Sequence, residues 1–199
     1  CGSGIIEAVA ELFLAGVITE DGLIDGRLAA KSPRVVQRGR THAYVVAQDG
    51  IEIAIGQRDI RSIQLAKAAL YAGVKLLLDK LGNPELGRIR LAGAFGSYID
   101  TKYAMILGLI PDCDLAEVSS VGNAAGTGAR MALISRAERR VIERVVREIE
   151  KIETALEPRF QEHFVNAMAL PNKVDRFPKL SSVVTLPLPA PETPDDEQS

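Results

Sequence analysis

Apolar side chains recur every three or four positions in two long segments near the start of the chain. Residues 5–15 have this helical period and end at Gly16, a residue type that readily adopts the left-handed conformation after a helix. Residues 60–81 show the same period over a longer span, with Asp59 as the expected N-cap and Gly82-Asn83-Pro84 as the end. Both segments are predicted to be amphipathic helices.

Shorter apolar runs bounded by turn residues predict strands. Residues 43–47 and 51–55 flank Gln48-Asp49-Gly50, the pattern of a β-hairpin. Residues 89–92 and 115–121 are two further apolar runs. The first is predicted to be a buried strand, and the second is predicted to be a strand as well.

A helix is expected after each of the last two strands. The first of these helices covers residues 100–109 and stops before Pro111, and the second covers residues 124–134. A strand, turn and helix that repeat in this way favour an α/β fold with a mixed sheet flanked by helices.

The last third of the chain is charged and then rich in proline. Ser135 and Glu138 form a capping box that opens a predicted helix extending to residue 156, and its apolar stripe predicts a core or helix–helix contact. Another short helix is expected over residues 159–170. Residues 171–199 carry several prolines and end in an acidic stretch, which is typical of an extended tail.

Composition limits the possible partners. A chain of 199 residues with 47% hydrophobic content can form one sizeable core, and its formal charge of −2, with no stripe of Lys and Arg, argues against nucleic acid. The two cysteines are too few for a disulfide framework or a four-thiolate cluster, so a reducing cytoplasm is expected. No apolar run is long enough to span a bilayer.

Glycine-rich turns precede three of the predicted helices, in residues 1–4, 93–96 and 122–128. Glycine lets the backbone N–H approach a phosphate or a purine closely, and a helix N-terminus adds partial positive charge. One such turn is weak evidence, but three together indicate a nucleotide site. Residues 1–4 lack the third glycine of a dinucleotide fingerprint, and no Gly-Lys-Ser/Thr is present, so Rossmann and P-loop sites are excluded.

Gln64 and Lys67 share one face of the predicted helix over residues 60–81. Taken alone, this pair fits a solvated edge better than a ligand contact. His42 and His163 have no cysteine or carboxylate at metal-ligand spacing, so each is expected to be structural or exposed. Cys113 has acidic neighbours that raise a thiol pKa, and it is expected to be inert.

Four segments in order resemble one known family, the ATP-dependent, ferredoxin-type reductive activators of corrinoid proteins. The nucleotide domain of these proteins is similar to that of acetate kinase, sugar kinases, Hsp70 and actin. The resemblance covers residues 1–170 and is carried by Cys1-Gly-Ser-Gly-Ile-Ile-Glu-Ala-Val-Ala-Glu-Leu12, Asp59-Ile-Arg-Ser-Ile-Gln-Leu-Ala-Lys-Ala-Ala69, Leu91-Ala-Gly-Ala-Phe-Gly-Ser-Tyr-Ile-Asp100 and Val121-Gly-Asn-Ala-Ala-Gly-Thr-Gly-Ala129.

The resemblance implies a set of nucleotide contacts. Residues 91–97 correspond to the adenosine motif, and residues 121–129 correspond to the second connecting motif, at the hinge between the two halves of the cleft. A loop at the start of the chain would border the nucleotide, and the helix over residues 60–81 would lie beside the adenosine. The expected ATP-binding residues are Gly2, Ser3, Gly4, Gln64, Lys67, Gly93, Ala94, Phe95, Gly96, Gly122 and Asn123.

The resemblance also implies what lies elsewhere in such a protein. Its phosphate-binding loops, the carboxylates that organise Mg²⁺ and the ferredoxin domain with its [2Fe–2S] cysteines are expected upstream of Cys1. Residues 1–170 are then the C-terminal part of an actin-like ATPase domain, inactive alone. The intact protein would use ATP to drive electron transfer that converts the Co(II) corrinoid of a methyltransferase system to Co(I).

Two alternatives stay open from the sequence. The chain could belong to an activator of a 2-hydroxyacyl-CoA dehydratase, which combines the same fold with iron–sulfur chemistry. It could also be an interaction module. The helix over residues 136–156, the helix after it and the tail would then form a homodimer surface or a docking site for the corrinoid protein.

Overall fold

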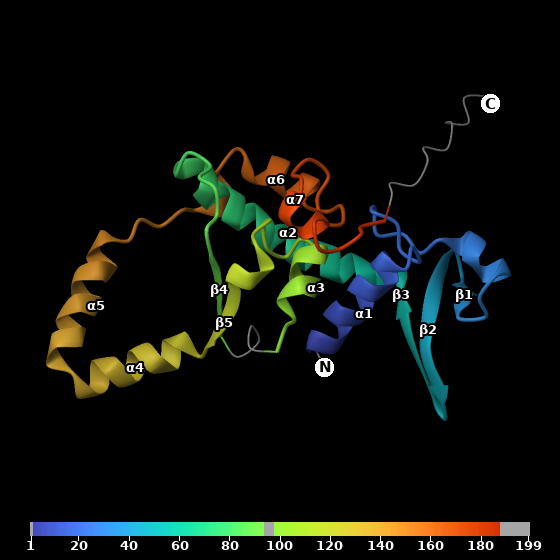
Figure 1. The fold of residues 1–199 in the computed structure, drawn as a ribbon, viewed down its shortest axis with the longest axis horizontal. Helices are drawn as coiled ribbons and strands as arrows, with labels where there is room; N and C mark the ends of the chain where they lie inside the picture. The colour runs from blue at the N-terminus through green and yellow to red at the C-terminus, as the bar shows by residue number, and fades with distance from the viewer. Residues whose placement is uncertain (1, 94–97, 188–199) are drawn as a thin grey trace.

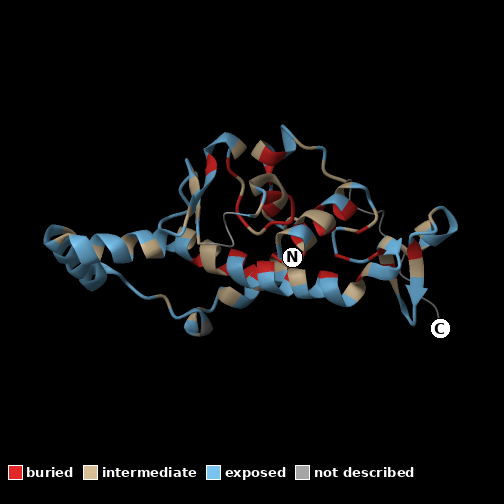
Figure 2. Ribbon diagram, turned by 90° about the horizontal axis from the view of Figure 1, so that it is seen from below, coloured by how far each residue is buried: buried red, intermediate tan, exposed pale blue. Residues whose placement is uncertain are grey.

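The computed structural model describes residues 2–93 and 98–187, and its central element is the long helix α2 (Gln57–Lys80). Helix α1 (Gly2–Leu14) covers the segment predicted as the first helix, and Gly16 follows it with a φ of +69°. Both helices contribute residues to one hydrophobic core, and Figure 2 colours the buried residues red. Within the described residues, no helix is long and apolar enough to cross a membrane.

Asp59 does not cap α2. The helix begins three residues earlier than predicted, so Gly56 is the N-cap and Asp59 is the third helical residue. The Asp59 carboxylate accepts a hydrogen bond from the Gly56 N–H at 2.8 Å. The carboxylate therefore stabilises the helix start from inside the first turn, as an acidic residue in a capping box does.

The predicted hairpin is confirmed and is extended by one strand. Strands β2 (Thr41–Asp49) and β3 (Ile51–Gly56) pair antiparallel around Gly50, whose φ of +80° the turn requires. Strand β1 (Val35–Arg38) pairs with the other edge of β2, and the short 3₁₀ helix η1 (Gly26–Ala30) precedes it. This sheet lies at one end of the molecule in Figure 1.

A second, separate sheet contains strands β4 (Ile89–Ala92) and β5 (Val118–Gly122), which run parallel. The α/β class is confirmed, but the described strands form two small sheets rather than one mixed sheet. The predicted burial of the first strand is wrong, because β4 alternates between intermediate and exposed residues. Most of β5 is exposed as well. Residues 115–117 form the 3₁₀ helix η3 (Leu115–Glu117) rather than strand.

Helix α3 (Thr101–Ile106) follows β4 with Asp100 as its N-cap, and helix α4 (Ala124–Ile134) follows β5 with the predicted bounds. The capping box before α5 (Arg136–Glu148) places the Ser135 hydroxyl as acceptor for the Glu138 N–H. This helix ends at Glu148 instead of residue 156. Helices α4 and α5 extend away from the body (Figure 1).

The chain then returns to the body through η4 (Thr154–Leu156) and helix α6 (Phe160–Asn166), which packs on α2. The structure differs from the expected extended tail over residues 171–187. Helix α7 (Pro178–Ser181) lies in this segment, and Phe177 and Leu180 are buried in the core. These two apolar side chains hold the segment on the body. The proline-rich composition gave no sign of this packing.

Candidate functional site

Two glycines meet where the parallel strands end. Gly93 follows β4 with a φ of +114°, and Gly122 is the last residue of β5 with a φ of +66°. The Gly93 N–H donates to the Gly122 carbonyl at 2.7 Å, which ties the two strand ends together. Residues with side chains rarely adopt such φ values, so the backbone conformation selects glycine at both positions.

Asn123 links this pair to the next helix. Its side-chain oxygen accepts the Gly126 N–H at 2.9 Å and so caps α4. A Cβ atom at Gly126 would lie only 2.8 Å from the Asn123 amide nitrogen, so glycine at 126 makes room for this cap. Asp100 caps α3 in the same way, because its carboxylate accepts the Lys102 N–H at 2.8 Å.

Gly2, Ser3 and Gly4 do not form the expected loop. They are the first turn of α1, so the prediction of a loop is wrong, although their position at a helix start agrees with the sequence. The N-terminus of α1 and the carboxyl ends of β4 and β5 point toward the same edge of the molecule in Figure 1. Ala94, Phe95 and Gly96 lie outside the described residues.

We call Gly93, Gly122 and Asn123 the strand-end edge. Its two glycines offer backbone without a side chain, close to the N-terminus of an 11-residue helix that the Asn123 side chain caps. Such an arrangement favours an anionic or planar ligand, because glycine allows close approach and the helix dipole attracts negative charge.

Gln64 lies elsewhere, at the contact of α2 with the chain before and after it. The side chain is buried, and its amide nitrogen donates to the carbonyls of Asp21 at 2.9 Å and Met168 at 2.8 Å. A Cβ atom at Gly22 would collide with this amide. The hydrogen bonds show a structural use of Gln64 that joins three parts of the chain.

Lys67 lies one turn further along α2 and is also buried. Its amine donates to the carbonyl of Pro171 at 2.7 Å and to that of Ala169. Burial lowers the pKa of Lys67 to about 7. A neutral amine has two N–H donors and the site offers two carbonyls, so the lysine is satisfied without a carboxylate.

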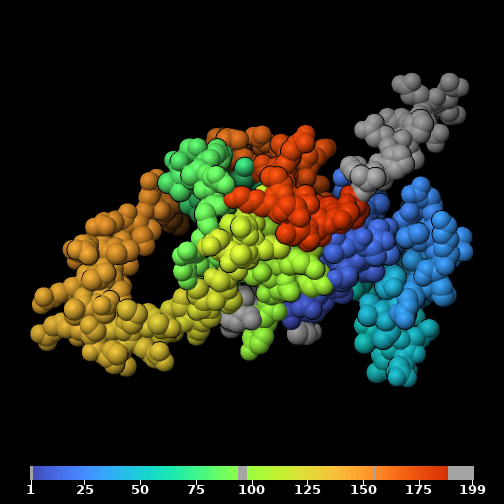
Figure 3. Space-filling model, viewed as in Figure 1, coloured from blue at the N-terminus to red at the C-terminus, as the bar shows by residue number. Residues whose placement is uncertain are grey.

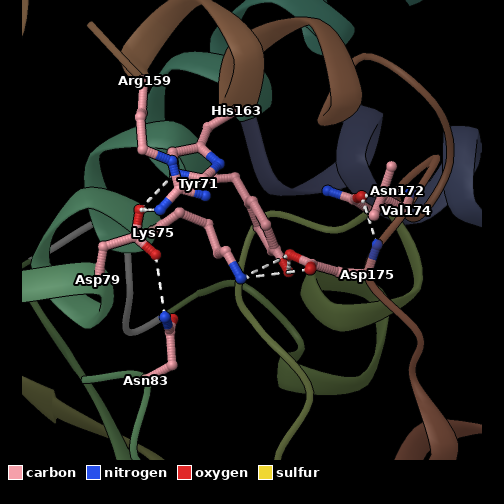
Figure 4. A network of polar contacts seen from close by, with 9 residues as sticks. All are labelled: Tyr71, Lys75, Asp79, Asn83, Arg159, His163, Asn172, Val174 and Asp175. Carbon is pink, nitrogen blue, oxygen red and sulfur yellow. Dashed lines mark hydrogen bonds and ion pairs between the residues drawn. The ribbon is translucent and has the colours of Figure 1, made fainter. Parts of the chain in front are cut away.

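A polar network joins α2 to α6 near its C-terminus (Figure 4). The Asp79 carboxylate is bound by His163 at 2.7 Å, Arg159 at 2.8 Å and Asn83 at 3.1 Å. Burial opposes ionisation of Asp79, but the hydrogen bonds from His163 and Asn83 and the charge of Arg159 lower its pKa. His163 is buried and paired with a carboxylate, which confirms the prediction of a structural histidine.

A second part of the network is centred on Asp175. It accepts a hydrogen bond from the Tyr71 hydroxyl at 2.8 Å and pairs with Lys75 at 3.2 Å. Burial raises the pKa of Tyr71, and the Asp175 charge adds to this effect. A cavity of about 90 Å³ lies between the two groups. Ligand pockets are typically about 300–1,000 Å³, so this one is too small for a nucleotide.

The sequence did not indicate Asp79, Tyr71, Lys75 or Asp175 as a cluster. These residues are spread over more than a hundred positions, and only their spacing on the α2 face could have hinted at a shared partner. Cys113 is buried, and burial is the main cause of its raised pKa, whereas the sequence pointed to its acidic neighbours.

The geometry can now be compared with known proteins. A family model described as the C-terminal domain of RACo, the ASKHA domain, matches residues 1–181. This chain belongs to that family. The matched residues include the strand-end edge, the α2 network and α7.

Two relatives support this assignment. The corrinoid activation enzyme RamQ of Eubacterium limosum is 38% identical over 177 residues, which cover 83% of this chain and 30% of RamQ. A solved structure named reductive activator for corrinoid, iron-sulfur protein superposes with a TM-score of 0.75 at 34% identity, covering 86% of this chain and 28% of that one. The chain thus spans less than a third of the length of either relative.

Proposed function

We propose that this chain is the C-terminal part of the ATPase domain of a protein that reductively activates corrinoid proteins. The observation that carries the proposal is the strand-end edge, which lies within a matched family of ASKHA domains. Both relatives described above are named for corrinoid activation, which favours this function over activation of a 2-hydroxyacyl-CoA dehydratase.

In the proposed reaction one electron leaves a reduced iron–sulfur cluster and reduces Co(II) of the corrinoid to Co(I), and the cluster becomes oxidised. ATP binding and hydrolysis supply the free energy for this uphill transfer. Within the described residues no group of His, Cys, Asp or Glu could hold a metal ion. From the resemblance, we propose that the [2Fe–2S] cluster and the Mg²⁺ ligands belong to parts of the complete protein outside this chain, which spans 30% and 28% of the two relatives.

For ATP, we propose contacts at the strand-end edge, at Ala94, Phe95 and Gly96, and at the first turn of α1. The glycines would lie under the nucleoside, with the N-terminus of α4 beside it. The hydrogen bonds of Gln64 and Lys67 to carbonyls of their own chain support a structural role for these two residues in place of the nucleotide contact expected from the resemblance.

The test compares two glycine variants in the complete protein. Gly93→Ala is expected to lower ATP affinity at least about tenfold, a change of about 1.4 kcal/mol. It should also slow ATP-dependent formation of Co(I), followed by loss of the Co(II) absorbance. Gly50→Ala is the matched control, because Gly50 also has a positive φ but lies at the tip of the β2–β3 hairpin.

The control should change ATP affinity less than twofold. Equal losses in both variants would assign the effect to backbone strain, and unchanged affinity in Gly93→Ala would refute the proposed edge. A protein that forms Co(I) equally fast without ATP would refute the function itself.

A further inference from the structure

Residues 26–48 form a basic segment within the β1–β2–β3 sheet and the 3₁₀ helix before it. The segment holds five of the 24 Lys and Arg residues of the chain and none of its 26 Asp and Glu residues. Figure 3 shows it in lighter blue at the right-hand end of the molecule. All five cations are exposed, namely Arg27, Lys31, Arg34, Arg38 and Arg40. A chain with a formal charge of −2 therefore has one strongly basic end.

Most of these charges have no carboxylate partner. Arg27 and Arg38 form ion pairs with acidic residues just outside the segment. In residues 2–93 and 98–187, Lys31, Arg34 and Arg40 form no ion pair. Like charges that lie in one segment repel one another, and an anionic partner would remove this repulsion.

Arg34 is held in place by its own sheet. Its Nη1 donates to the carbonyls of Val45 at 3.1 Å and Val46 at 2.7 Å, where the pairing of β2 with β3 shifts register. The carbonyls carry no net charge, so the guanidinium keeps its positive charge and its remaining N–H donors. A cavity of about 240 Å³ beside it is lined by Pro33, Arg34, Val45 and Gln48. A carboxylate that enters this cavity would meet a guanidinium already positioned, which reduces the entropy lost on binding.

Aliphatic side chains are exposed on the same sheet. Ile51 and Ile53 of β3 are 78% and 58% exposed, and Val46 of β2 is exposed as well. Arginine beside apolar side chains is typical of protein–protein interfaces, in which polar groups surround an apolar centre. Nucleic acid fits less well, because Tyr44 is the one Phe, Tyr or Trp in residues 26–56 and is half-buried, so no exposed ring offers base stacking.

We propose that the basic segment, together with Ile51 and Ile53, docks the corrinoid protein through an acidic patch of that protein. This inference rests on the proposed function, under which the activator binds a corrinoid protein, reduces it and releases it. Complementary charges speed the encounter of two proteins, and electron-transfer partners use small contacts that separate readily. The corrinoid protein should therefore present carboxylates around a small apolar centre.

A partner at this sheet leaves room for ATP at the strand-end edge. Figure 1 places the sheet and the strands β4 and β5 on opposite sides of α1. Gly56 ends β3 and is the N-cap of α2, so the sheet continues directly into the central helix. ATP and the corrinoid protein can thus bind at the same time, as ATP-driven electron transfer requires.

Binding of the complete activator to its Co(II) corrinoid protein, measured by calorimetry without ATP, tests the inference. Lys31→Glu/Arg40→Glu reverses two exposed charges and should lower the affinity at least about tenfold at low salt. The loss should shrink at high salt, because salt screens exposed charges.

Lys173→Glu/Arg176→Glu is the matched control. It reverses the same two residue types at exposed sites between α6 and α7. Its affinity for the corrinoid protein should change less than about twofold, as for surface substitutions elsewhere. ATP affinity should be unchanged in both double variants, which excludes unfolding.

No loss of affinity in Lys31→Glu/Arg40→Glu, an equal loss in the control or no binding by the wild type would overturn the inference. Unchanged affinity for the corrinoid protein, with loss of wild-type binding to duplex DNA or to vesicles of anionic lipid, would overturn it in favour of a nucleic acid or a membrane. Co(I) formation tests the proposed function separately. An activator that forms Co(I) with ATP but binds the corrinoid protein equally well in both double variants would keep that function and lose this docking site.

Discussion

The α2 face that holds Gln64 and Lys67 and the strand-end edge at Gly93 and Gly122 differ in how they use their polar groups. On α2, buried side chains donate to carbonyls more than a hundred positions away, and their hydrogen-bonding capacity is consumed inside the fold. At the strand-end edge, a Cβ atom added at Gly93 would meet no described atom within 4 Å. Polar residues on a helix face can thus stabilise a fold, while bare backbone at a helix start leaves room for a ligand.

The largest effect is expected where the C-terminal segment enters the packed region. Leu180→Ala should lower the free energy of unfolding by about 2–5 kcal/mol, because Leu180 is fully buried and the truncation leaves a cavity. Denaturant unfolding measures this change. Val183→Ala, at an exposed site of the same segment, should cost less than about 0.5 kcal/mol. Similar small effects at both positions would mean that residues 171–187 do not pack into the core.

The pH dependence of folding stability tests the burial of Lys67 on the α2 face. Its folded-state pKa is about 7, below its value of 10.5 when unfolded. The unfolded chain therefore binds more protons above pH 7, and stability should rise with pH from about 7 toward 10, by at most about 1.4 kcal/mol per pH unit. The measurement is the difference in unfolding free energy between wild type and Lys67→Met. A flat difference would contradict a neutral buried amine.

Gln64→Ala should separate structure from ligand binding. Removing the amide leaves the carbonyls of Asp21 and Met168 without their donor, which should cost about 1–3 kcal/mol of folding stability. ATP affinity of the complete protein, measured by calorimetry below the unfolding temperature, should stay within twofold. A tenfold loss of affinity at unchanged stability would instead place Gln64 at the nucleotide.

The smallest effect is expected at the N-cap of α5. Ser135→Ala removes the hydroxyl that accepts the Glu138 N–H and should destabilise α5 by about 0.5–2 kcal/mol. Faster amide exchange in the first turn of α5 measures the loss. Ser182→Ala, which lies outside α5, is the control and should leave the exchange of the α5 amides unchanged. No change in α5 would mean that the cap contributes nothing to this helix.

Local signals predicted much of the secondary structure. The hairpin around Gly50, the bounds of α4 and the cap at Ser135 depend on residues close in sequence, and the structure confirms them. The resemblance correctly indicated the family, because four motifs in order carry more information than any single turn.

The predictions that the structure contradicts depend on contacts between segments that are distant in the sequence. Residues 149–156 lack the packing that would continue α5, and residues 171–187 fold because Phe177 and Leu180 find places in the core. The burial of Lys67 depends on carbonyls more than a hundred positions away. No local pattern reports the presence or absence of such partners.

The sequence by itself determined the hairpin turn at Gly50 and the starts of α4 and α5, since caps, glycines and apolar periods act within a few residues. It also indicated the turns at the ends of β4 and β5, because residues with side chains rarely adopt the positive φ values found at Gly93 and Gly122. Tertiary structure decided which polar side chains are consumed in the fold and which apolar faces remain open. These outcomes depend on burial, and burial is fixed only when distant segments meet.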